Sequence, residues 1–158
     1  MFSYSETITE SIGIYLAGTI YKQNEIGFNW KDSFINQLKN SQVSMQSDYT
    51  FLINDPNPSE GVTKESKFLV NRDKQTIDES KILVAYISKV TFGTTMEIFY
   101  AYSNNKIVIV IDPMKQFRDD LWLNYHSHYI VDTPGEAACF ISEIQHSRRN
   151  CYVIPKSK

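Results

Sequence analysis

The sequence predicts an α/β protein in which helices cover both faces of a parallel β-sheet. Its apolar runs are short and almost continuous, as is typical of strands buried on both sides: Ile12 to Ala17, Ile82 to Ile87, and Ile107 to Ile111. Amphipathic segments separate these runs. Strands that alternate with helices along the chain favour a parallel sheet over separate layers of strands and helices.

The first half of the chain contains turn and capping residues that bound its elements. Gly18 ends the first apolar run, and a loop over 19–28 follows. Asn29 can then cap a helix, because its side chain can accept a hydrogen bond from a free N–H group of the first turn. A second strand is predicted over 49–53, and it stops at the Asn- and Pro-rich segment 54–58 because proline fixes φ. The apolar residues at helical spacing after the cap are Trp30, Phe34, Ile35 and Leu38.

The helices of the second half are predicted from apolar residues at helical spacing. One helix is expected over 64–80 and another over 94–103, and a short helix is expected within 115–123. The residues expected to face the core are Phe68, Leu69 and Ile77 in the first of these helices, and Met96, Phe99 and Tyr100 in the second.

A short strand and a capped helix are predicted near the C-terminus. The strand covers Tyr129 to Val131. Thr133 then opens a helix with Pro134 at its first position and Glu136 three residues after the cap, which is the pattern of a capping box.

Composition and charge argue against several classes of partner. The formal net charge is -2 and there is no basic stripe, so any ligand derived from nucleic acid is expected to be a small molecule, not a polymer or a membrane surface. No stretch approaches the roughly 18 apolar residues of a membrane span, and the polar segment 1–10 does not have the pattern of a signal peptide. Cys139 and Cys151 form no metal-binding pattern. We therefore expect one cytoplasmic domain over 1–158 with reduced thiols, frayed at 1–10 and 155–158.

Glu97 is the first candidate for catalysis. Ligands of parallel sheets bind beyond the carboxyl ends of the strands, and Glu97 follows Gly93 and Thr94 in the predicted first turn of a helix after a buried strand. The helix dipole favours a carboxylate there, so we expect Glu97 to stay ionised and able to attack an anomeric carbon. In the simpler interpretation, which stays open, Glu97 only balances the positive end of the helix.

Asp73 and Tyr15 are candidates for assisting groups. Glycosidic cleavage needs a group that protonates the leaving base, and Asp73 lies on the helix before the central strand. The alternative is a surface salt bridge with Arg72 or Lys74, which holds unless the two acids converge in space. The hydroxyl of Tyr15, inside the first strand, could hold the carboxylate of Glu97, or the ring could only fill the core.

Two further segments could contact a ligand. Gly18 and Thr19 form a turn that lets a ligand approach the backbone, although a lone Gly-Thr turn is a weak signal. Ser127, between His126 and His128, precedes a strand, and this segment could touch a phosphate or be a solvated loop. The histidines form no recognisable Ser-His-Asp arrangement.

Several motifs together resemble the nucleoside 2-deoxyribosyltransferase superfamily, which includes the 2'-deoxynucleoside 5'-monophosphate N-hydrolases. The resemblance spans Ile12 to Ile141, and the order and spacing of the motifs are more specific than any one of them. The motifs are Ile14-Tyr15-Leu16-Ala17-Gly18-Thr19, Asn71-Arg72-Asp73, Ser80-Lys81-Ile82-Leu83-Val84-Ala85, Gly93-Thr94-Thr95-Met96-Glu97-Ile98, Ala101 and Asn105-Lys106.

The resemblance implies a flavodoxin-like sheet with strand order 2-1-3-4-5 and no metal or organic cofactor. It implies a glutamate nucleophile at Glu97, an aspartate near the leaving base at Asp73, and a tyrosine at Tyr15 that orients the nucleophile. It also implies a homodimer or higher homo-oligomer in which a neighbouring subunit helps to close the site around a small nucleoside or nucleotide.

Some positions depart from the pattern of the transferases. Where they have an aspartate, this chain has Thr91, and the related nucleotide hydrolases place a hydroxyl residue there that binds the 5'-phosphate. Ser127 matches a serine that those hydrolases contribute from the neighbouring subunit, and His128 stands where transferases tend to have an asparagine. These differences favour a nucleotide slightly. Phe99 stands where many members have glycine. The larger side chain of Phe99 would narrow the pocket or move a neighbouring element.

The predicted function is cleavage of the N-glycosidic bond of a (2'-deoxy)nucleoside or its 5'-monophosphate through a covalent glycosyl ester on Glu97. The sugar would pass to another base or to water, depending on whether the site excludes water. The alternative is a non-catalytic nucleotide-binding sensor or sponge on the same fold. Two carboxylates argue against this alternative, because a protein that only binds an anionic nucleotide gains little from them.

Overall fold

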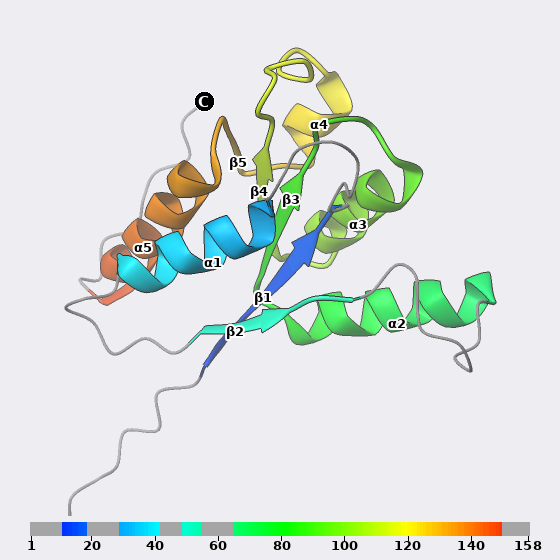
Figure 1. The fold of residues 1–158 in the computed structure, drawn as a ribbon. Coiled ribbons are helices and arrows are strands. Elements are labelled where there is room, and N and C mark those ends of the chain that lie inside the picture. The colour runs from blue at the N-terminus through cyan, green and yellow to red at the C-terminus, as the bar shows by residue number, and fades with distance from the viewer. Residues whose placement is uncertain (1–10, 19–28, 42–48, 55–64, 150–158) are drawn as a thin grey trace, which may run out of the picture.

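The structure, a computed structural model, describes residues 11–18, 29–41, 49–54 and 65–149. In this part of the chain, five parallel strands form one sheet in the order β2-β1-β3-β4-β5 (Figure 1). This order confirms the predicted α/β, flavodoxin-like fold. The strands are β1 (Ile12–Ala17), β2 (Tyr49–Leu52), β3 (Ile82–Tyr86), β4 (Ile107–Ile111) and β5 (Tyr129–Val131). The helices are α1 (Trp30–Asn40), α2 (Ser66–Glu79), α3 (Phe92–Ser103), α4 (Leu121–Tyr125) and α5 (Pro134–Arg149).

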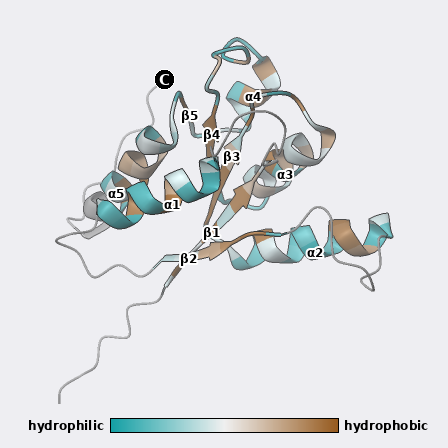
Figure 2. Ribbon diagram, viewed as in Figure 1, coloured by the Kyte–Doolittle hydropathy of each residue, from teal (hydrophilic) through white to brown (hydrophobic). Residues whose placement is uncertain are grey.

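Helices cover both faces of the sheet (Figure 1). α1 and α5 pack together over one face, and α2 and α3 lie over the other. Side chains of β1 alternate between the faces: Ile14 and Leu16 join the core under α1 and α5, whereas Tyr15 and Ala17 join the core under α2 and α3. Figure 2 shows the hydrophobic strands of the sheet between helices that carry hydrophilic residues. Tyr15 therefore faces the layer that contains α2 and α3.

Side-chain caps begin the helices where the sequence predicts them. The side chain of Asn29 accepts a hydrogen bond from the backbone N–H of Lys31 at 3.0 Å, and the hydroxyl of Thr133 accepts one from the N–H of Glu136 at 3.2 Å. The Glu136 carboxylate accepts a hydrogen bond from the N–H of Asp132 at 2.7 Å, one residue before the cap. Both predicted caps are confirmed, and the reciprocal bond of the capping box is displaced by one residue.

The face of α3 that meets the sheet differs from the predicted one. Met96 and Phe99 were expected in the core, but they are 68% and 46% exposed, and Tyr100 is only half-buried. The prediction was wrong because apolar residues surround α3 on all sides, so that their spacing does not reveal which stripe packs on the sheet. The buried residues of α3 are Thr94, Ile98 and Ala101.

No helix in the described ranges is long and apolar enough to cross a bilayer. α2 is shorter than the helix predicted over 64–80. The second half of α2 packs on the sheet and buries Ile77, as expected. Its first half extends past the edge of the sheet (Figure 1), where Leu69 is half-buried and Phe68 is 46% exposed. The core position predicted for Phe68 was wrong because the described sheet does not reach under that turn.

α4 begins later than the helix expected within 115–123. The carboxylate of Asp112, fully buried at the end of β4, accepts hydrogen bonds from the N–H groups of Gln116 and Phe117 at 3.2 and 2.9 Å. Asp120 then caps α4 by accepting from the N–H of Leu123 at 2.7 Å. Carboxylates that accept from nearby N–H groups compete with a continuous helix, which explains the loop between them.

Candidate active site

A cavity of about 410 Å³ lies between α2 and α3. Asp73 of α2 and Glu97 of α3 both line it, so that the structure brings the two acids to one space. Its volume lies in the range of about 300 to 1,000 Å³ that is usual for small-molecule sites. The remaining lining residues, mostly apolar, are Val70, Lys74, Ile77, Phe92, Gly93, Met96, Phe99 and Tyr100.

Tyr15 holds the side chain of Glu97. The Tyr15 side chain, on β1, is 3% exposed, and its hydroxyl donates a hydrogen bond to Oε1 of Glu97 at 2.7 Å. Burial, followed by the charge of Glu97, raises the pKa of Tyr15, so the hydroxyl remains a donor. One carboxylate oxygen of Glu97 is thus engaged with Tyr15, on a side chain that also lines the cavity.

The charge state of Glu97 differs from the predicted one. Glu97 lies in the second turn of α3 instead of the first, and its surroundings raise its pKa from 4.5 to about 7. Burial is the largest cause; the hydrogen bond from Tyr15 lowers the pKa, the charge of Asp73 raises it, and the cations Lys31 and Arg72 lower it. The expectation of a permanently ionised carboxylate was therefore wrong, because burial outweighs the helix dipole, which acts mainly within the first turn.

Asp73 is both part of a salt bridge and part of the cavity wall. Its Oδ1 atom accepts hydrogen bonds from Nη2 of Arg72 at 2.8 Å and from Nδ2 of Asn54 at 2.9 Å. Its side chain is 27% exposed and lines the same cavity as Glu97. The salt bridge with Arg72 therefore does not exclude a role in the site, since Asp73 also lines the cavity.

Asn54 is a residue of this region that sequence reasoning missed. It follows the end of β2, and its amide donates to Asp73 and, at 3.0 Å, to the hydroxyl of Thr76. The Asn54 amide also lowers the pKa of Tyr15, so that it lies near the Tyr15 hydroxyl. The signal was available, because a polar residue at the carboxyl end of a parallel strand lies on the ligand side of the sheet.

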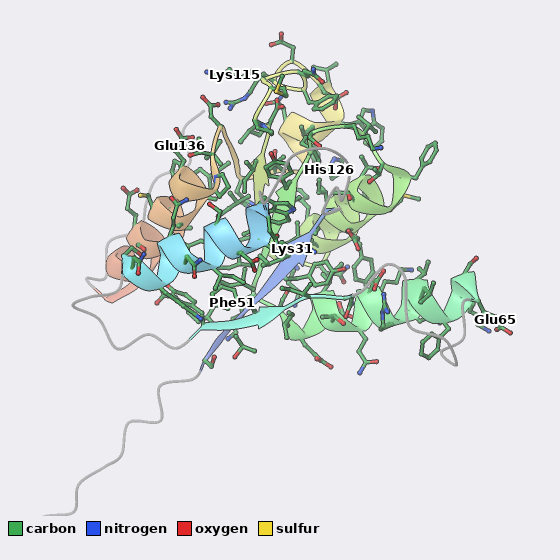
Figure 3. All side chains as sticks on the ribbon, in the orientation of Figure 1. Lys31, Phe51, Glu65, Lys115, His126 and Glu136 are labelled. Carbon is green, nitrogen blue, oxygen red and sulfur yellow. The ribbon has the colours of Figure 1, made fainter. Side chains whose placement is uncertain are left out.

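Lys31 is a second residue that sequence reasoning missed. It lies in the first turn of α1, where the helix start meets the sheet (Figure 3), and is only 5% exposed. Its ammonium group lies 5.7 Å from the centre of the Trp30 ring, and its charge lowers the pKa of Glu97. A lysine at a buried helix start was not distinguishable in the sequence from a solvated one.

The backbone conformation and the surroundings of Gly18 require a glycine at this position. Its φ is 107°, which favours glycine, and a Cβ atom there would lie 2.6 Å from the carbonyl oxygen of Tyr86. The close approach is therefore between the end of β1 and the end of β3. Thr19, which was predicted to bind substrate beside Gly18, lies outside the described residues.

Thr91, Gly93 and Thr94 form the start of α3. The Thr91 hydroxyl caps the helix by accepting from the N–H of Thr94 and donates to the Thr94 hydroxyl at 2.9 Å. Gly93 lines the cavity, and no atom lies within 4 Å of the position that a Cβ would take. This helix start therefore presents open backbone to the cavity, as anion-binding helix starts do.

Ser127 and His128 lie away from this cavity. They precede β5, where Nδ1 of His128 accepts a hydrogen bond from the N–H of Val108 at 3.0 Å and Oγ of Ser127 donates to the carbonyl of Leu123 at 2.5 Å. Residues that precede a parallel strand lie at the amino edge of the sheet, opposite the edge where β1 and β3 end. Ser127 and His128 therefore do not join Glu97 within one described chain.

Loss of the Tyr15 hydroxyl is expected to slow any reaction that uses Glu97 as a nucleophile. Tyr15→Phe should lower kcat about 10- to 100-fold, the usual value of a hydrogen bond to a charged group. It should also move the acid limb of the pH–rate profile to higher pH, because the bond from Tyr15 lowers the pKa of Glu97. Tyr125→Phe, which changes an exposed tyrosine of α4, is the matched control. An unchanged profile in Tyr15→Phe would contradict the assigned role.

Comparisons with known proteins identify the fold and not the activity. No family model matches the chain, and no curated protein matches it. A conserved protein from Enterococcus faecalis V583 has a similar structure, with a TM-score of 0.65, 13% identity and coverage of 85% of this chain and 99% of that one. A 2-deoxyribosyltransferase from Bacillus psychrosaccharolyticus has a TM-score of 0.57 and 20% identity, covering 80% and 90% of the two chains. A 2-desoxiribosyltransferase from Leishmania mexicana has a TM-score of 0.51 and 18% identity, covering 85% and 98%.

The class that these findings define is a flavodoxin-like α/β protein with a sheet of order 2-1-3-4-5. Within that class, the chain has the fold of the two deoxyribosyltransferases, as the sequence motifs predict.

Proposed function

We propose that this protein cleaves the N-glycosidic bond of a (2'-deoxy)nucleoside or its 5'-monophosphate through a covalent glycosyl ester on Glu97. The observation that carries the proposal is the arrangement of Glu97: Tyr15 holds one of its oxygens, and its side chain lines a cavity that Asp73 also lines. A carboxylate fixed in this way can attack an anomeric carbon, and a second acid within the same space can manage the proton of the leaving base.

The first step forms the glycosyl ester. Because Tyr15 engages Oε1 of Glu97, the other oxygen, Oε2, attacks C1' of the sugar. The C1'–N bond breaks as the Oε2–C1' bond forms, and the electron pair of the broken bond stays on the base. The base accepts a proton from Asp73 after its carboxylate has taken up a proton from solvent, or from a water molecule beside it.

The second step releases the sugar and restores Glu97. A nitrogen of a second base, or a water oxygen, forms a bond to C1' while the ester bond to Glu97 breaks. The proton of the attacking group passes to Asp73 or to water. Transfer and hydrolysis are therefore two outcomes of one mechanism, and they differ only in which nucleophile reaches the ester.

The apolar part of the cavity suits a planar base. Its apolar lining residues are Val70 and Ile77 from α2 and Phe92, Met96 and Phe99 from α3. Apolar and aromatic walls with few polar groups are usual for sites that enclose an aromatic ligand. The Phe99 side chain, where resembling proteins often have glycine, occupies part of this wall and supports a restricted choice of base.

The start of α3 supports a 5'-phosphate on the substrate. Gly93 leaves the backbone open toward the cavity, and the Thr91 hydroxyl lies at the same helix start. The positive end of a helix and its free N–H groups stabilise anions. The Thr91 hydroxyl now donates to Thr94, so it would have to turn from that partner to donate to a phosphate.

The same proposal includes a homodimer or higher homo-oligomer with a shared site. We define the α3–α4 face by Met96, Phe99 and Trp122, which line a second cavity of about 420 Å³. His126, labelled in Figure 3, also lines this cavity, and Trp122 is 73% exposed. Exposed apolar groups of this kind mark interaction surfaces. In such an assembly, the neighbouring copy bound to this face would place its own Ser127 near Glu97.

Trp122→Lys is expected to dissociate the assembly, because it places a charge in the apolar contact. Molar mass by light scattering after size-exclusion chromatography measures the change. Phe68→Lys, at an exposed apolar residue of α2, is the matched control and should leave the mass unchanged. A monomeric wild-type protein, or dissociation by Phe68→Lys alone, would contradict the assignment of this face.

The cytoplasmic location predicted from the sequence belongs to the same proposal. The composition of the chain supports it, since two cysteines without a framework of disulfide spacing are usual for a compartment in which thiols stay reduced.

Incubation with substrates tests the proposed reaction. Deoxynucleosides, ribonucleosides and their monophosphates would each be supplied with and without an acceptor base, and the free base, the free sugar and any new nucleoside would be measured. Turnover of at least one substrate class is expected. Tight binding of an intact nucleotide without turnover, equal in wild type and Glu97→Ala, would instead support the non-catalytic sensor or sponge.

A further inference from the structure

We propose that Asn54 is a positioning residue of this site: its amide, anchored by Thr76, holds Asp73 in the wall of the cavity that Glu97 also lines. This inference rests on the proposed function for its catalytic meaning. The contacts that carry it belong to the structure alone, since Asn54 joins the end of β2 to two residues of α2.

The amide of Asn54 determines which oxygen of Asp73 is available. Asn54 Nδ2 donates to Oδ1 of Asp73 at 2.9 Å, and Nε and Nη2 of Arg72 donate to the same oxygen at 3.1 and 2.8 Å. Among the described residues, these three donors all reach Oδ1 and none reaches Oδ2. Oδ2 is therefore the oxygen that can exchange a proton with a ligand in the cavity. Two donor groups on one oxygen also restrict rotation of the carboxylate.

Thr76 fixes the amide itself. Its hydroxyl accepts a hydrogen bond from Asn54 Nδ2 at 3.0 Å and donates to the carbonyl of Arg72 at 2.9 Å. Thr76 lies on α2 one turn after Arg72 and close to Asp73, so that the helix carries both the anchor and the acid. The Thr76 hydroxyl thus sets the position of Asn54 relative to α2 without being placed at the cavity.

Asn54 also lies near the group that binds Glu97. The two N–H groups of its amide donate to Asp73 and Thr76, and the amide lowers the pKa of the Tyr15 hydroxyl, which donates to Oε1 of Glu97 at 2.7 Å. One neutral side chain therefore binds Asp73 and lies near the hydroxyl that binds Glu97. A neutral amide suits this place, because a charged group there would change the ionisation of Glu97.

The charged groups that surround Glu97 come from different elements. They are Asp73 and Arg72 on α2 and Lys31 on α1, with the Tyr15 hydroxyl on β1. An aspartate in place of Asn54 would add a negative charge beside Asp73 and remove the donor to it. This change should raise the pKa of Glu97 above its value of about 7.

The experiment compares Asn54→Ala, Asn54→Asp, Thr76→Val and Thr76→Ser. Asn54→Ala is expected to lower kcat about 10- to 100-fold with a smaller change in KM, as a displaced catalytic group does. Asn54→Asp should also shift the acid limb of the pH–rate profile upward by about one pH unit. Thr76→Val should lower kcat in the same direction as Asn54→Ala, whereas Thr76→Ser, which keeps the hydroxyl, should stay close to wild type.

Asn36→Asp is the matched control, because it makes the same chemical change at an exposed position of α1. The pKa of Glu97, followed by NMR of ¹³C-labelled carboxyl groups without substrate, gives a readout that does not need turnover. It should rise in Asn54→Asp and stay unchanged in Asn36→Asp. Circular dichroism verifies that each variant folds, and Thr76→Val with Thr76→Ser decides the question if the Asn54 variants do not.

Failure of the proposed function and failure of the positioning role of Asn54 give different results. If wild type cleaves no substrate, the proposed function fails, and the NMR titration still decides whether Asn54 controls the ionisation of Glu97. If wild type is active but Asn54→Ala and Thr76→Val keep its kcat and pH profile, the positioning role is overturned while the proposed function stands.

Discussion

Glu97→Gln is expected to reduce kcat by about 10⁴-fold or more, the size of effect seen when a covalent nucleophile is removed. The amide keeps the shape of the side chain and an oxygen that can accept the hydrogen bond from Tyr15, so substrate binding should change little. Steady-state rates give the loss. Mass spectrometry of acid-quenched protein should detect a glycosyl adduct on Glu97 in wild type and none in the variant. Residual activity within tenfold of wild type would exclude Glu97 as the nucleophile.

The same variant should be more stable than wild type at alkaline pH. The pKa of Glu97 is about 7 in the folded protein and near 4.5 when the chain is unfolded. Between these values the folded state binds more protons than the unfolded state, so stability falls as pH rises from about 4.5 to about 7 and stays lower above it. A shift of this size corresponds to at most about 3 kcal/mol. Glutamine does not ionise, so the free energy of unfolding in urea at pH 8 should be higher for Glu97→Gln than for wild type. The difference between the two proteins should shrink near pH 5.

Asp73→Asn is expected to lower kcat about 10²- to 10⁴-fold on substrates with an ordinary base, because general acid catalysis contributes that much. The loss should depend on the leaving group. A nucleoside whose base departs readily without a proton should lose far less activity, since Asp73 then has little to contribute. Rates with both substrate types in wild type and variant give the comparison.

Lys74→Met supplies the control for Asp73, because Lys74 also lines the cavity and is the next residue of α2. It should not change the dependence of the rate on the leaving group. An equal loss by Asp73→Asn on both substrate types would mean that Asp73 positions the substrate and does not handle a proton.

The fold was readable from the sequence because its signals are local. The strand runs beginning at Ile12, Ile82 and Ile107 are apolar on both faces, and only a parallel sheet covered on both sides buries such runs. Asn29 and Thr133 marked helix starts for a similar reason, since a cap acts within its own turn. The side of α3 that packs on the sheet could not be predicted, because apolar residues surround the helix. Only the position of the sheet determines that Ile98 is buried and Met96 is exposed.

For the candidate site, the sequence alone determined which residue types stand where: an acid after a strand–turn–helix start, a second acid on the preceding helix and a tyrosine in the first strand. Only the tertiary structure decided how they act together. The pKa of Glu97 depends on burial and on charges from other elements, and the role proposed for Asn54 depends on a contact across 19 residues of chain to Asp73. Desolvation and hydrogen bonds depend on distances in space, and the linear order of residues does not contain those distances.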